Sequence, residues 1–139
     1  MKKIECILLV DDSTSTNFYH KKLIEISGEA THVFEAENGL EALDYMNKKG
    51  KFTSSHPRPN IIFLDINMPK MDGFEFLENY AKLDDAKKAD IIIVFLTTSN
   101  WTKDKIKAIE SKLVYDFIEK PLTKETLQHI CAYYRETYL

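Results

Sequence analysis

The most constraining feature of this sequence is the apolar run at residues 61–64, which ends directly at Asp65. A run of this kind, bounded by turn residues, is typical of a strand that is buried on both faces. A polar turn with Pro69 and Gly73 follows, and a helical pattern begins after it. Because an unpaired charge is costly to bury, Asp65 must lie at the rim of a sheet or serve a ligand.

Four further apolar runs alternate with segments of helical spacing. Together the runs predict strands at residues 4–10, 31–36, 61–64, 91–96 and 114–118. We expect a first helix that begins in the Ser/Thr cluster at 13–16, which is rich in potential N-caps, carries apolar positions between 18 and 26, and ends at Gly28. Further helices are expected at 40–46, stopped at Gly50, at 74–83 and at 103–113, and a last helix is capped by Thr123. Residues 51–60 form a predicted loop. This alternation is typical of one α/β domain over residues 1–139, with a five-stranded parallel sheet covered by helices on both faces.

The spacing of apolar residues also predicts which side chains face the core. The helical positions expected on core-facing stripes include Phe18, Leu23, Ile24, Ile26, Leu40, Leu43, Tyr45, Met46, Phe74, Leu77, Tyr80, Ala81, Leu127, Ile130, Cys131, Tyr134 and Tyr138. The two cysteines, Cys6 and Cys131, lie on a predicted strand and a predicted helix, so we interpret them as buried free thiols. Free thiols fit a reducing cytosol, and we expect a cytoplasmic protein.

Bulk charge and hydropathy exclude several classes of function. A net charge of -3 and a pI near 5.8 do not favour nucleic acid or an anionic membrane surface. No apolar run approaches the roughly 20 residues of a membrane span. The four histidines share no edge of the predicted sheet, and we interpret them as structural or solvated.

Polar side chains follow the apolar runs at positions that a parallel sheet would bring together. The first strand ends at Asp11 and Asp12, the third at Asp65, the fourth at Thr97 and the fifth at Lys120. The carboxyl ends of parallel strands share one edge, where ligands bind in open α/β sheets. We therefore expect three carboxylates, a hydroxyl and an ammonium to converge.

Clustered carboxylates repel one another unless a cation neutralises them. Hard oxygen ligands favour Mg²⁺ (or Mn²⁺), and no His/Cys pair suits zinc. An aspartate beside Mg²⁺ and a lysine is a plausible phosphoryl acceptor, because phosphoryl transfer depends mainly on positioning and charge neutralisation. Taken alone, Asp11 and Asp12 are equally well explained as charges at a helix N-terminus.

These motifs give the chain a resemblance to the receiver domains of two-component response regulators. The matching features are Asp11-Asp12, the segment from Leu64 to Gly73, the exit Leu96-Thr97-Thr98-Ser99, and Lys120-Pro121. The resemblance covers essentially the whole chain. It implies a flavodoxin-like, doubly wound (βα)5 fold with strand order 2-1-3-4-5.

The resemblance also implies a role for each site residue. Asp65 is then the phosphoacceptor. Asp12 is a direct Mg²⁺ ligand, Asp11 binds through water or orients the site, and the backbone carbonyl of Asn67 completes the metal site. Thr97 and Lys120 bind phosphoryl oxygens, the Lys120-Pro121 peptide bond is cis, and Phe117 holds an aromatic switch position, although as a core residue it needs no such role.

Two departures from the family pattern stand out. The interval from Thr97 to Lys120 is about one residue longer than is usual in the family, and Thr98 would restore the spacing. We prefer Thr97 because the apolar run ends there, which places the extra residue near positions 112–115. The loop at 51–60 is also longer than usual, but it lies at the opposite edge from Asp65.

The expected function is a signalling switch rather than an enzyme. A sensor histidine kinase, a histidine phosphotransfer protein or a small phosphodonor would phosphorylate Asp65, and slow self-dephosphorylation would follow. With no output domain in the sequence, we expect signalling by contact with an unidentified protein target, as a monomer or weak dimer. The alternatives are a flavin-binding electron carrier on the same fold and a phosphorylation-independent scaffold. A haloacid-type phosphatase is disfavoured because Asn67 stands where its second aspartate belongs.

Overall fold

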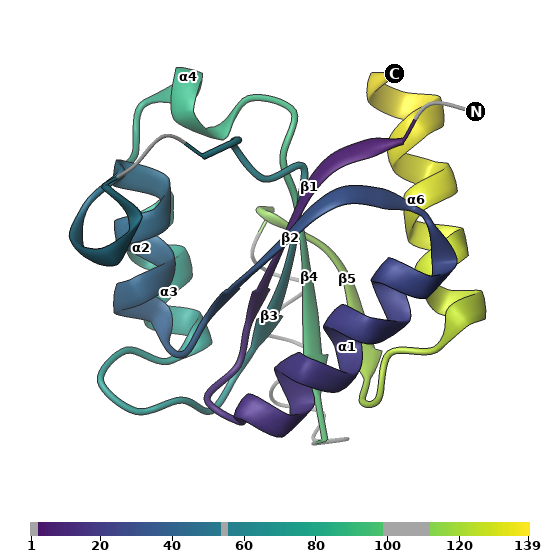
Figure 1. Cartoon of the computed structure of the whole chain (residues 1–139). Coiled ribbons are helices and arrows are strands. Elements are labelled where there is room, and N and C mark those ends of the chain that lie inside the picture. The colour runs from purple at the N-terminus through teal and green to yellow at the C-terminus, as the bar shows by residue number, and fades with distance from the viewer. Residues whose placement is uncertain (1–2, 54–55, 99–111) are drawn as a thin grey trace.

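Five parallel strands form one sheet in the order β2-β1-β3-β4-β5. A computed structural model describes residues 3–53, 56–98 and 112–139 (Figure 1). The strands are β1 (Ile4–Val10), β2 (Ala30–Ala36), β3 (Ile61–Asp65), β4 (Ile92–Thr97) and β5 (Val114–Glu119). The parallel sheet and the flavodoxin-like order are therefore confirmed. Asp65 and Thr97 are the last residues of their strands, so both lie at the carboxyl edge.

The described helices are α1 (Thr14–Ser27), α2 (Gly39–Asn47), α3 (Gly73–Tyr80), α4 (Asp85–Lys88) and α6 (Lys124–Tyr138), with a short 3-10 helix at Gly50–Phe52. Local signals set several of their ends. The Ser13 side chain accepts a hydrogen bond from the backbone N–H of Thr16 at the start of α1. Gly28 ends α1 in the left-handed conformation, and Thr123 caps α6, as predicted.

The helices cover the two faces of the sheet (Figure 1). Cys6, Leu8 and Val10 of β1 pack into the hydrophobic cluster that includes α2 and α3, whereas Ile7 and Leu9 pack into the cluster that includes α1 and α6. This alternation follows from the two-residue period of a strand. Both cysteines are buried free thiols, as expected. None of the described helices is long and apolar enough to cross a membrane.

Two predicted helix ends were wrong, and one predicted helix lies outside the described residues. Helix α2 ends at Asn47 rather than near Gly50, because Lys48 adopts a left-handed conformation and its N–H bonds to carbonyls of the last turn. Helix α3 ends at Tyr80, and the short α4 follows, where we had expected one helix to residue 83. The predicted helix at 103–113 extends over residues that the structure leaves undescribed, up to residue 111.

Several side chains predicted to face the core are exposed. Phe18 is 62% exposed and Ile26 is 84% exposed, because the buried stripe of α1 contains Asn17, His20 and Ile24 instead. Residues at a spacing of three and four share a helix face, so positions 18 and 26 fall beside this stripe. The other corrections are Leu40, Ala81 and Tyr138, which are exposed at helix ends.

Candidate functional site

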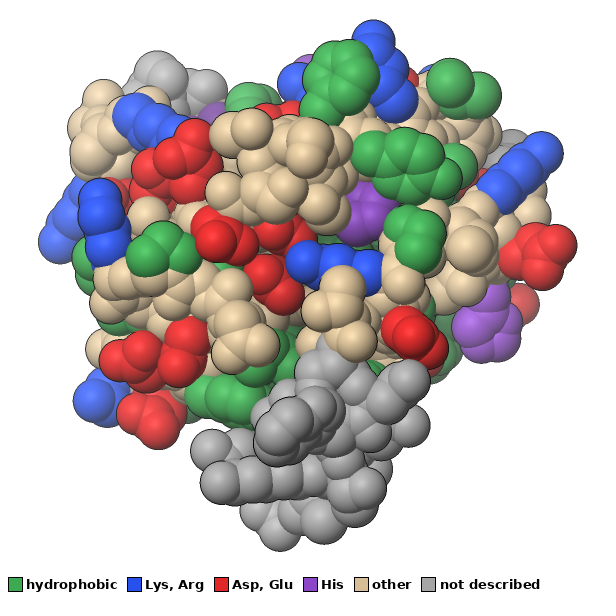
Figure 2. All heavy atoms as spheres, turned by 90° about the horizontal axis from the view of Figure 1, so that it is seen from below, with side chains coloured by type: hydrophobic (Ala, Val, Ile, Leu, Met, Phe, Trp, Pro, Cys, Tyr) green, Lys and Arg blue, Asp and Glu red, His purple; other side chains and the backbone are tan. Residues whose placement is uncertain are grey.

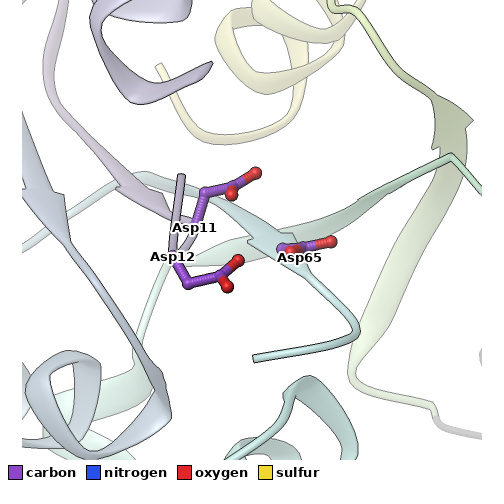
Figure 3. Close-up of side chains that lie close together, drawn as sticks. All are labelled: Asp11, Asp12 and Asp65. Carbon is purple, nitrogen blue, oxygen red and sulfur yellow. The ribbon is translucent and has the colours of Figure 1, made fainter. Parts of the chain in front are cut away.

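The three aspartates predicted at the carboxyl edge do come together. Asp11 and Asp12 directly follow β1, and Asp65 ends β3, which is paired with β1 (Figure 3). One carboxylate oxygen from each residue lies within 4.8 Å of the others. The apolar strand residues before each aspartate fix the strand ends, so the buried sheet itself sets this spacing. Asp11 and Asp65 are buried, while Asp12 is exposed to solvent.

Lys120 joins this cluster from the end of β5. Its ammonium lies 3.2 Å from Asp65 Oδ1 and makes a closer ion pair with Asp11 Oδ2. The backbone N–H of Lys120 donates to the carbonyl of Thr97 at 2.8 Å, which ties the end of β5 to β4. Figure 2 shows this edge face-on, with acidic side chains gathered near its centre and a basic and a histidine side chain beside them. The predicted convergence of carboxylates and ammonium is thus confirmed.

Close backbone packing holds the Asp65 segment in place. The Asp65 Oδ1 atom accepts a hydrogen bond from the N–H of Ile66 at 2.9 Å. The N–H of Gly73 donates to the Ile66 carbonyl at 2.8 Å. A Cβ at position 73 would lie 2.5 Å from the Asp65 carbonyl oxygen, so only glycine allows this approach. Asp72 caps α3 through a reciprocal pair of hydrogen bonds with Glu75.

Burial and charge shift the proton affinities of the two central groups. Burial, followed by the nearby Asp11 carboxylate, raises the pKa of Asp65 to about 6, although the Lys120 ammonium opposes the rise. Burial alone would lower the pKa of Lys120, but its hydrogen bond to Asp11 and the charges of both aspartates outweigh burial and raise it. Lys120 therefore keeps its positive charge at neutral pH. A cation bound beside Asp65 would lower the raised pKa of that carboxyl.

Contacts from α1 orient Asp11. Its Oδ1 atom accepts the N–H of Ser13 at 2.9 Å, and its carbonyl accepts the Nδ2 of Asn17 at 3.0 Å. Since Lys120 occupies its Oδ2 atom, both Asp11 carboxylate oxygens already have partners. The exposed Asp12 carboxylate remains accessible from solvent.

Two further predicted site residues, Thr97 and Asn67, lie at the same edge, whereas Phe117 lies within β5. Thr97 is 1% exposed at the end of β4, whereas the alternative Thr98 is exposed and follows the strand. Asn67 is exposed two residues beyond Asp65. Phe117 is half-buried on β5, opposite Phe95 of β4, and packs against the core cluster that includes α2 and α3. The peptide bond before Pro121 is cis, as the resemblance implies.

Sequence reasoning did not place His20 beside the site, although the interpretation of this histidine as structural is confirmed. We interpreted all four histidines as structural or solvated and away from any shared edge. His20 is 1% exposed, and its Nε2 atom accepts a hydrogen bond from the backbone N–H of Leu122, two residues after Lys120. Its position on α1, soon after the acidic pair, was an available signal that it lies near this edge, but no sequence pattern indicated its partner Leu122.

The donor set fits a hard divalent cation. Three carboxylates offer oxygen ligands, and this is the sole potential metal cluster of His, Cys, Asp or Glu among the described parts of the chain. Mg²⁺ takes one or two carboxylates and keeps several waters, so an exposed acidic group beside buried ones suits it. The cluster is therefore able to hold a metal ion.

Comparison with known proteins places these features in a family context. The sequence model described as the response regulator receiver domain matches residues 7–132. Response regulator Rcp1 of Synechocystis sp. is 34% identical over 104 residues, which cover 75% of this chain and 69% of Rcp1. Sensor histidine kinase CheAY of Helicobacter pylori is 34% identical over 122 residues, 87% of this chain and 14% of that protein. The chain thus spans most of Rcp1 and a small part of the kinase.

Solved structures show the same similarity in three dimensions. A two-component response regulator from Cytophaga hutchinsonii matches with a TM-score of 0.85 at 27% identity, over 97% of this chain and 99% of that one. The phosphorylated cyanobacterial phytochrome response regulator RcpA matches with a TM-score of 0.70 at 28% identity, over 97% of this chain and 94% of that one. Both similarities extend over nearly the whole chain.

Proposed function

The chain belongs to the response regulator receiver family of two-component signalling, and on this premise we propose that it is a phosphorylation-dependent switch with Asp65 as phosphoacceptor. The observation that carries the proposal is the position of Asp65, which ends β3 with the Lys120 ammonium 3.2 Å from its Oδ1 atom and the Asp11 and Asp12 oxygens within 4.8 Å. This carboxylate lies at the carboxyl edge of the sheet, beside an ammonium and two further carboxylates that can bind a cation and a phosphoryl group.

The proposed reaction is a phosphoryl transfer from a phosphohistidine. A carboxylate oxygen of Asp65 attacks phosphorus, the P–N bond breaks, and its electron pair leaves with the donor imidazole. The Lys120 ammonium then pairs with a phosphoryl oxygen, and the Thr97 hydroxyl donates to another. Such charge-assisted hydrogen bonds oriented in advance are the main protein contribution to phosphoryl transfer.

A divalent cation completes the proposed site. Asp12, Asp65 and the Asn67 carbonyl would hold Mg²⁺ (or Mn²⁺), with Asp11 binding indirectly because its carboxylate oxygens already have partners. The ion supplies neutralisation of the carboxylates and of the incoming phosphoryl group. A bound ion would also favour the ionised, nucleophilic form of Asp65, whose pKa in the metal-free protein is about 6.

The signal would leave the site through Thr97 and Phe117. Once Thr97 bonds a phosphoryl oxygen, the space that it leaves admits the half-buried Phe117 ring, which changes the surface around β5 and α6. We further propose slow loss of the phosphoryl group, since the short, exposed Asn67 side chain leaves room for water. Beyond this self-dephosphorylation we propose no enzymatic activity.

The proposed partners are a sensor histidine kinase or a histidine phosphotransfer protein, and a protein target. Receiver sequences related to this chain also occur within a sensor histidine kinase, which supports histidine phosphate as the donor chemistry. The buried free thiols of Cys6 and Cys131 fit a reducing compartment, which supports a cytoplasmic location.

The deciding experiment is intact-mass measurement after incubation with acetyl phosphate. We expect wild type to gain the mass of one phosphoryl group with Mg²⁺ and none with EDTA. Asp65→Asn should gain none, whereas the control Asp85→Asn, a change in the short helix α4, should behave like wild type. A gain of equal size in Asp65→Asn would show that another residue is the acceptor.

A further inference from the structure

Three contacts hold the segment Lys120–Leu122 against the rest of the molecule. The Lys120 N–H donates to the Thr97 carbonyl at 2.8 Å. The Leu122 N–H donates to His20 Nε2 at 3.1 Å, and the Leu122 side chain is fully buried in the core. The bond to the Thr97 carbonyl uses only backbone atoms, and the burial of Leu122 needs only an apolar side chain. The third depends on one particular side chain, the imidazole of His20.

The hydrogen bond to Leu122 requires a neutral His20. An imidazole nitrogen accepts only through its lone pair, so Nε2 carries no proton and the ring proton is on Nδ1. Burial lowers the pKa of His20, and the neighbouring Lys120 ammonium lowers it further. A buried backbone N–H also needs an acceptor, so an apolar residue at position 20 would leave the Leu122 N–H unsatisfied.

The same helix also holds the partner of Lys120. Asn17, one turn before His20 on the buried stripe of α1, donates to the Asp11 carbonyl. Helix α1 is therefore bonded on one side to Asp11 and on the other to the segment that carries Lys120. A lysine side chain is long and flexible, so its ammonium is only as well placed as the backbone from which it extends.

We propose that His20 is a positioning residue, which anchors the backbone after Lys120 to α1 and thereby places the Lys120 ammonium at Asp65. This inference rests on the proposed function, in which that ammonium pairs with the phosphoryl group. A histidine with a purely structural role would stabilise the fold without any selective effect on Lys120. The two roles therefore make different predictions for phosphorylation.

The first test compares phosphorylation rate constants with acetyl phosphate and saturating Mg²⁺. His20→Leu removes the acceptor and should lower the rate constant by about 10- to 100-fold, the range expected for a misplaced catalytic group. His20→Gln offers a carbonyl oxygen at a similar reach and should stay within about threefold of wild type. The side chain of His20→Asn is one methylene shorter than that of His20→Gln and should not reach the Leu122 N–H, so this variant should resemble His20→Leu. It replaces His20→Leu in the test if that variant does not fold.

A double-mutant cycle with Lys120→Met tests whether the effect acts through the ammonium. If it does, His20→Leu should have no further effect on the rate constant in the Lys120→Met background, although it should still lower resistance to urea. An equal loss in both backgrounds would overturn the inference, as would wild-type rates in both His20→Leu and His20→Asn. Absence of any phosphoryl gain in wild type would instead overturn the proposed function on which the inference rests.

A second readout does not depend on phosphorylation. Nitrogen-15 NMR of the imidazole should show His20 as the neutral tautomer with its proton on Nδ1. Amide exchange of Leu122 should be protected in wild type and His20→Gln, and at least about tenfold faster in His20→Leu. A protonated ring at neutral pH, or equal protection of Leu122 in all variants, would contradict the proposed anchor.

Discussion

Removing the Asp65 charge should stabilise the metal-free protein. The folded environment raises the pKa of this carboxyl from 3.8 to about 6, chiefly through burial and then through Asp11. The difference corresponds to about 3 kcal/mol between the two protonation states. Because the folded pKa is the higher one, the carboxyl's favourable contribution is complete below pH 3.8 and is lost as the pH rises through about 6.

The assay is urea denaturation in EDTA from about pH 4 to about pH 8, followed by circular dichroism. Over this range the unfolding free energy of wild type should fall by up to about 3 kcal/mol relative to Asp65→Asn, so the variant is the more stable protein at neutral pH. Glu78→Gln, which removes an exposed carboxylate from α3, should follow wild type. Excess Mg²⁺ should close most of the gap, because it binds only the folded wild-type site.

Parallel pH profiles for wild type and Asp65→Asn would refute this reasoning. They would mean that Asp65 is solvated or paired in the folded protein as well as it is in the unfolded chain. The same result would remove the electrostatic reason for a cation at this site.

Three further predictions concern the surroundings of the site. Gly73→Ala should cost about 1–3 kcal/mol in urea denaturation, because its Cβ would meet the Asp65 carbonyl. Arg135→Met should cost about 3 kcal/mol in the same assay by leaving the buried Glu29 carboxylate without its ion pair, and adding Glu29→Gln should recover part of the loss. Burial lowers the pKa of His20, so the folded protein should lose stability as the pH falls below 6.5. In the Asp65→Asn background, the His20→Gln variant should therefore lose less unfolding free energy between about pH 7 and pH 5 than the protein that keeps His20.

The sheet and its functional edge were predictable because short-range sequence patterns decide them. A buried parallel strand is a continuous apolar run, and a polar residue that ends the run must emerge at the edge. That reasoning located Asp11, Asp65, Thr97 and Lys120 without any knowledge of which strands are neighbours. Strand order was not accessible in this way and came from the resemblance to receiver domains.

What the sequence did not reveal depends on contacts between distant segments. His20 has its partner at Leu122, and nothing local indicates that α1 lies against the loop after β5. The burial of α1 was misjudged for a related reason. Its core-facing stripe contains two polar residues, Asn17 and His20, each of which bonds to backbone near the site, so hydrophobic periodicity pointed to Phe18 and Ile26 instead.

The charges of the site explain why a divalent ion, rather than Lys120 alone, should make it competent. Three ionised carboxylates and one ammonium leave two negative charges within a few ångströms, and the structure shows the ammonium shared between Asp11 and Asp65. An incoming phosphoryl group adds further negative charge at Asp65. A bound divalent cation would bring the site to neutrality and would weaken the attraction of the carboxylates for Lys120. The ammonium would then be available to the phosphoryl oxygens, so the charge balance of the cluster predicts that phosphorylation requires a metal ion.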